Sequence, residues 1–124
     1  MAIIVALFLT VAVGFMAIGI DLGSLYFRQK SLQTQADMTA ISAVLNLSGT
    51  PDDHAQATVI GNRLEASALT SLEYGRYIYD SALPAEDRFE TRDLSDVDVN
   101  AAEVVLKGAA PLFFSQTFLD TDST

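Results

Sequence analysis

The chain begins with a long run of mostly apolar residues. Residues 1–20 contain no charged side chain. At about 1.5 Å of rise per residue, an α-helix of this length crosses a hydrocarbon layer about 30 Å thick. The run therefore predicts a transmembrane helix. A secretory signal peptide is the alternative, because Ala17 and Gly19 offer a small-x-small cleavage site, but the run lacks the basic residues of a signal peptide.

Helical periodicity continues beyond this run, and no proline occurs before Pro51. The pattern predicts one helix that extends from the membrane to about Leu47. Its apolar positions recur at steps of three, four or seven and form a stripe, namely Leu25, Leu32, Ala36, Ala40, Ala43 and Leu47. Either the rest of this chain or a neighbouring helix of an assembly covers this stripe, and we expect the first.

Small residues recur every four positions in the apolar run. They are Ala2, Ala6, Thr10 and Gly14, followed by the pair Gly19 and Gly23. Within a lipid bilayer this spacing lets a second helix approach closely, which makes these positions a candidate helix-packing interface. Apolar spans are also rich in alanine and glycine for reasons of composition alone.

The pattern changes after residue 48. Thr50 as N-cap, Pro51 at the first helical position and two aspartates in the first turn predict a second helix over residues 51–72. Its expected buried positions are Val59, Leu64, Ala66 and Leu69.

Alternating aromatic and polar residues from Tyr74 to Asp80, and the segment VDVNAAEVVLKGAA over residues 97–110, predict two or three antiparallel strands. Pro111 is expected to open a short closing helix through Phe114. The fold class is therefore an α+β membrane protein. It comprises an anchor (1–20), an extended amphipathic helix continuous with it (21–48) and a small acidic extramembrane domain (49–124) that combines a helix with antiparallel strands.

Charge and cysteine content exclude several functions. The chain has 16 acidic and 7 basic residues, a net charge of -9, and every charged residue lies after Ile20. A surface of this sign does not favour nucleic acid or anionic lipid headgroups. Since the chain has no cysteine, disulfides, thiolate metal sites and a cysteine nucleophile are excluded.

No catalytic or cofactor site emerges from the remaining polar residues. His54 is the single histidine and has no second metal ligand of its kind, so a solvated side chain is expected. Asp93, Asp96 and Asp98 lack the spacing of a calcium-binding loop and are expected in a solvated loop. Asp21, the first charged residue, is expected to mark the membrane boundary. We therefore expect a protein that is not an enzyme and binds no cofactor.

The segment DLGSLYFRQKSLQTQAD, which follows the apolar run, resembles the N-terminal region of TadG-like proteins. These belong to the TadE/TadG group of the bacterial tight-adherence (Flp) pilus system. The matching positions are Asp21, Gly23, Tyr26, Arg28, Leu32, Gln33, Ala36, Asp37, Ala40 and Ala43. Met38, Thr39, Ile41 and Ser42 stand where the group has an alanine-rich stretch.

The resemblance implies a structural or assembly component in the bacterial inner membrane, with its C-terminal domain in the periplasm. Its partners would be the lipid bilayer and the transmembrane helices of pilus-assembly proteins. Arg28 and Lys30, by contrast, favour a cytoplasmic C-terminal side under the positive-inside rule. The alternative function is a single-span accessory subunit that stabilises a large photosynthetic or respiratory membrane complex.

Overall fold

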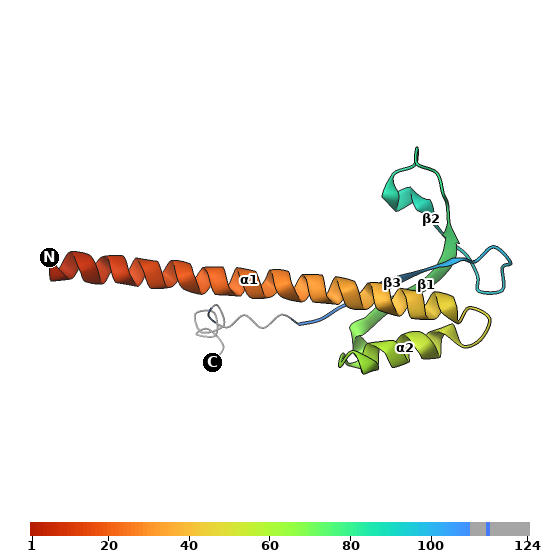
Figure 1. Cartoon of the computed structure of the whole chain (residues 1–124), viewed down its shortest axis with the longest axis horizontal. Helices are drawn as coiled ribbons and strands as arrows, with labels where there is room; N and C mark the ends of the chain where they lie inside the picture. The colour runs from red at the N-terminus through yellow and green to blue at the C-terminus, as the bar shows by residue number, and fades with distance from the viewer. Residues whose placement is uncertain (110–113, 115–124) are drawn as a thin grey trace, which may run out of the picture. The chain divides into compact units, whose positions relative to one another are not determined.

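The computed structural model describes residues 1–109 and 114, and shows one long helix followed by a small mixed domain (Figure 1). The helices are α1 (Ala2–Leu45) and α2 (Pro51–Gly61). The strands are β1 (Leu69–Tyr77), β2 (Phe89–Thr91) and β3 (Ala101–Leu106), with short 3-10 turns η1 (Ala66–Ala68) and η2 (Ala85–Arg88) before β1 and β2. The arrangement is α+β, as the sequence pattern predicts.

The chain divides into two compact units. One consists of Met1–Ser31 with Ala109–Thr124, and the other of Leu32–Gly108. Helix α1 contributes its first 30 residues to one unit and its last turns to the other. The predicted closing helix after Pro111 lies outside the described residues, apart from Phe114.

Helix α1 is continuous over 44 residues and ends at Leu45, two residues before the expected end. Asn46 explains this end, because its side-chain amide donates to the carbonyl of Ser42 at 2.9 Å and its backbone N–H bonds to Ala43 at 3.1 Å. These bonds tighten the last turn and satisfy carbonyls that a helix end leaves open. The chain then turns at Gly49, whose N–H bonds to the carbonyl of Asn46 at 2.9 Å.

Helix α2 packs on the last turns of α1 through small residues and hydroxyl groups. The hydroxyl of Thr58 donates to that of Ser42 at 2.9 Å, and Ser42 donates to the carbonyl of His54 at 3.4 Å. Ala43 and Ala55 are fully buried. Because alanine side chains are short, the two helix backbones can approach closely enough for these hydroxyl bonds to form.

The prediction that the second helix extends to residue 72 is wrong, since α2 ends at Gly61. Arg63 adopts the left-handed conformation at φ 62°, its N–H bonds to the carbonyl of Ile60, and the N–H of Leu64 bonds to that of Val59. This pair of bonds is a Schellman motif, which reverses the chain direction at a helix end. The left-handed position usually carries glycine, so the arginine hid the helix end from the sequence pattern.

The expected buried positions of this segment are correspondingly mixed. Val59 is buried at 1% exposure, while Leu64 and Leu69 are half-buried. Ala66 is exposed, because it lies in η1 rather than on a helix face. Thr50 does occupy the N-cap position, but its side chain makes no capping hydrogen bond.

The sheet has the order β2-β1-β3 and is antiparallel throughout, which confirms the prediction of two or three antiparallel strands. A register shift between Leu69 and Ser71 leaves Thr70 without a cross-strand partner, as in a β-bulge. The predicted strand over residues 97–110 is shorter than expected: β3 begins only at Ala101, and Val97 is fully exposed in the preceding loop.

Gly75 lies at the centre of the sheet, paired with Thr91 on one side and Ala101 on the other. A Cβ atom there would lie 2.7 Å from the ring of Phe89 and would also collide with the backbone oxygen of Glu90. The absence of a side chain therefore lets Phe89 cover the strand, as aromatic residues do beside glycine in sheets.

Candidate functional site

The predicted helix-packing interface is open in the structure. Ala2, Ala6, Thr10 and Gly14 are all exposed, and so are Gly19 and Gly23. A Cβ atom built on any of the three glycines meets no described atom within 4 Å. Both groups of small residues therefore leave room for a second helix at close approach, and the packing of a helix there stays a prediction.

Large apolar side chains are exposed around the whole first part of α1. Ile4, Phe8 and Phe15 are 70–72% exposed. Within the part of the chain that the structure describes, α1 is the one helix long and apolar enough to cross a membrane. A membrane-inserted helix and an N-terminal signal sequence share this composition.

Asp21 is buried, with 7% of its surface exposed, although it stands at the end of this apolar region. Its two carboxylate oxygens accept from the backbone N–H of Phe114 at 3.2 and 3.3 Å. A buried carboxylate is tolerated only when hydrogen bonds replace its lost hydration. The sequence pattern gave no indication that the chain itself would bind this side chain.

The stripe of the extended helix is covered mainly by the rest of the chain, as we expected. Ala43 is fully buried, and Leu32, Ala36, Ala40 and Leu47 are half-buried. Leu32 faces Gly108, where an added Cβ would lie 3.1 Å from Leu32 Cδ1. Leu25, in the other unit, remains 37% exposed.

The other residues of the segment that resembles TadG-like proteins have no common role in the structure. Tyr26 is 69% exposed, and the side chains of Gln33 and Asp37 also face outward. Arg28 is exposed as well. Of the small and apolar motif residues, Leu32, Ala36, Ala40 and Ala43 are buried or half-buried, whereas Gly23 is exposed. The polar motif residues, apart from the buried Asp21, lie on the surface.

A second apolar stripe lies on the opposite side of α1 from Ala43, and sequence reasoning missed it. Met38, Ile41 and Leu45 are 52%, 59% and 77% exposed. Their steps of three and four place them on one helix face. Met38 and Ile41 stand where TadG-like proteins have an alanine-rich stretch. This departure was the sequence signal from which the stripe could have been found. We call these three residues the outer stripe.

A shallow groove of about 290 Å³ lies between α2 and β1, lined by Asp52, Gln56 and residues 69–72. At its side, the hydroxyl of Tyr74 donates to Asp52 Oδ1 at 2.6 Å. Burial and this hydrogen bond to a carboxylate raise the pKa of Tyr74 well above its usual range. The bond links β1 to the first turn of α2.

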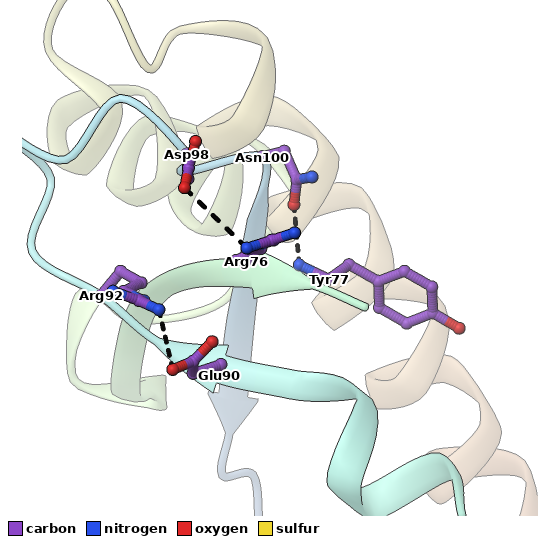
Figure 2. Close-up of polar contacts among 6 residues, drawn as sticks. All are labelled: Arg76, Tyr77, Glu90, Arg92, Asp98 and Asn100. Atoms are coloured by element: carbon purple, nitrogen blue, oxygen red, sulfur yellow. Dashed lines mark hydrogen bonds and ion pairs between the residues drawn. The ribbon is translucent and has the colours of Figure 1, made fainter. Parts of the chain in front are cut away.

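Polar contacts hold the loop before β3 against the sheet (Figure 2). Asn100 Oδ1 accepts from the N–H of Tyr77 at 2.7 Å, and Asp98 lies 3.9 Å from the guanidinium of Arg76. Arg92 donates to Glu90 at 2.8 Å, and this bond raises the pKa of Arg92. Asp98 is therefore a surface ion-pair partner.

His54, Asp93 and Asp96 are exposed. Among the described residues, no three potential ligands lie close enough together to hold a metal ion. Comparison with protein-family models, with curated proteins and with solved structures gives no match.

Proposed function

We propose that this chain is a non-enzymatic, membrane-anchored structural component that assembles with other membrane proteins through its long helix. The outer stripe carries the proposal, because it leaves three large apolar side chains exposed beyond the apolar run. Contiguous exposed apolar surface of this kind is typical of protein–protein contacts. The resemblance to TadG-like proteins makes a tight-adherence pilus assembly the proposed setting, with the chain in the bacterial inner membrane.

The small core of the extramembrane domain supports the same proposal. Among the described residues, Val59 and Thr39 are the largest fully buried side chains. A domain that buries so little large apolar surface, and that has no disulfide, gains stability from packing on a partner. A helical neighbour on the outer stripe supplies that packing.

The exposed fractions of these side chains give the free energy that a partner gains by covering the outer stripe. Burying one fully exposed large apolar side chain contributes about 1.5–3 kcal/mol. Covering Met38, Ile41 and Leu45, each at least half exposed, contributes roughly 3 kcal/mol, which corresponds to an affinity change on the order of 100-fold.

Native membranes extracted in a mild detergent, separated by size and analysed by mass spectrometry test this proposal. The triple variant Met38→Gln, Ile41→Gln, Leu45→Gln should lose the companions that the unaltered chain retains. Gln33→Ala, which changes an exposed polar residue of the same helix segment, is the control and should retain them. Companions that stay with the triple variant would overturn the role of the outer stripe.

The identity of the companions tests the setting. Proteins of the pilus machinery support the assembly role. A pigment-bearing or respiratory complex at fixed stoichiometry would replace it with the role of an accessory subunit that braces this complex.

Orientation is tested separately, and because the chain has no cysteine, an introduced cysteine is its single labelling site. Ser48 is exposed just after α1, so Ser48→Cys provides one accessible thiol. We propose that the domain is periplasmic, and a maleimide that reaches the periplasm but does not cross the inner membrane should then label this variant in intact cells. Labelling only after lysis would place the domain in the cytoplasm, as Arg28 and Lys30 suggest by charge.

A further inference from the structure

The outer edge of β3 has no neighbouring strand among the described residues. The sheet order β2-β1-β3 places β3 at one end, paired with β1 on a single side. Alternate residues of such an edge direct their N–H and C=O groups away from the sheet. These groups form a template on which another extended chain can pair.

The composition of β3 does little to prevent such pairing. Its sequence AAEVVL contains no proline and a single charged residue, Glu103. Natural edge strands are commonly protected by lysine, proline or a bulge. Val105, two residues from Glu103 on the same face, is 45% exposed, so this face offers an apolar contact beside a carboxylate.

The charges on this face of the sheet indicate which kind of added strand the edge of β3 favours. Glu103 is directly opposite Glu73 of β1, and both side chains are exposed. Directly opposed like charges destabilise a sheet. Glu73 accepts a hydrogen bond from Thr91 of β2 at 3.3 Å, whereas no described basic residue forms an ion pair with Glu103.

We propose that the edge of β3 binds an extended segment of another protein by strand addition, with a lysine or arginine of that segment beside Glu103. The added strand extends the sheet to four strands and pairs its backbone with the free N–H and C=O groups of β3. Its basic side chain offsets the Glu73–Glu103 repulsion, and an aliphatic residue two positions away packs on Val105. This surface is separate from the outer stripe, so the proposal stands independently of the proposed function.

The test uses the full chain, ¹⁵N-labelled and held in lipid nanodiscs. The probe is the peptide Thr-Thr-Lys-Thr-Val-Thr-Thr, blocked at both ends, and the matched peptide carries glutamate in place of lysine. We expect amide shift changes and slowed hydrogen exchange confined to β3. The lysine peptide should bind about 1.5- to 5-fold more tightly than the glutamate peptide, the range of one cross-strand charge pair.

Two variants separate a local effect of Glu103 from the overall negative charge. Glu103→Lys should reverse the preference, so that the glutamate peptide binds more tightly. This substitution also removes the repulsion with Glu73, so the sheet should fold at least as well. Glu86→Lys makes the same charge change at an exposed site in η2 and should leave the preference for lysine intact.

Shift changes that map outside β3, an absence of binding, or a preference that Glu103→Lys does not reverse would each overturn the proposal.

Discussion

Gly75→Ala is expected to destabilise the small α+β domain, because the added methyl group has no room. Its Cβ would lie 2.7 Å from Cζ and 2.9 Å from Cε2 of Phe89, and would collide with the carbonyl oxygen of Glu90. The ring can rotate away, but the carbonyl belongs to the backbone of β2, which pairs with β1 at this point. Strand β2 must therefore move.

Overpacking of this kind typically costs about 1–3 kcal/mol. Replacing glycine by alanine within a regular element regains about 0.5–1 kcal/mol, because the unfolded chain loses freedom. The net expectation is a loss of about 1–2 kcal/mol. Since small domains have urea m values of about 1–3 kcal/mol/M, the unfolding midpoint should fall by roughly 1 M.

Urea unfolding of the full chain in mild detergent micelles, followed by tyrosine fluorescence, measures this shift. The chain has no tryptophan and four tyrosines, of which Tyr74 and Tyr77 lie in β1. Gly61→Ala is the matched control, because a Cβ at the end of α2 meets no described atom within 4 Å. It should raise the midpoint slightly, as alanine favours helix by up to about 1 kcal/mol over glycine. An unchanged or higher midpoint for Gly75→Ala would refute the steric argument.

Three further predictions concern stability. Arg63→Gly should raise the free energy of unfolding by about 1 kcal/mol, because it relieves a left-handed residue without altering the Schellman bonds; a decrease in urea unfolding would contradict this. Tyr74→Phe removes the bond to Asp52 and should cost about 0.5–1.5 kcal/mol at neutral pH. Because the folded pKa of Tyr74 is raised above the usual 10.0, the unaltered domain should also lose stability as the pH rises above 10, where tyrosine ionises in the unfolded chain. The variant should show less of this loss, and absorbance titration should show that its highest-pH tyrosine step is gone. Ala43→Leu inserts a larger side chain at a fully buried site and should cost about 1–3 kcal/mol, whereas Leu45→Ala on the exposed face should change the same midpoint little.

The sequence alone predicts the helical part of the fold closely. A run of 20 uncharged residues, followed by helix-compatible residues up to Pro51, predicts one continuous helix, and α1 ends within two residues of the expected position. The alternation around Tyr74 and the run AAEVVL predict strands that β1 and β3 confirm. These features are encoded locally, in side-chain periodicity and in the positions of proline.

The end of α2 depends on tertiary structure. Residues 62–72 contain no proline, so helix and strand were both compatible with their local pattern. The left-handed Arg63 ends the helix, and pairing with β3 draws residues from Leu69 onward into β1. A cross-strand ladder joins segments about 30 residues apart, and the local pattern of residues 69–72 does not indicate that they pair with a strand so distant in the sequence.

For the part of α1 after residue 20, the sequence likewise predicts the helix, and tertiary packing decides which of its faces is buried. Both the stripe of the extended helix, which contains Ala43, and the outer stripe have helical periodicity, so the sequence alone did not determine which one the domain covers. Packing against α2 selected the small residues. Alanine lets the two helices approach closely, and the hydroxyl groups of Ser42 and Thr58 then form hydrogen bonds between them. The larger Met38, Ile41 and Leu45 were left on the surface. The sequence thus determined a long apolar helix and an α+β domain, and the tertiary structure decided which apolar side chains remain available to partners.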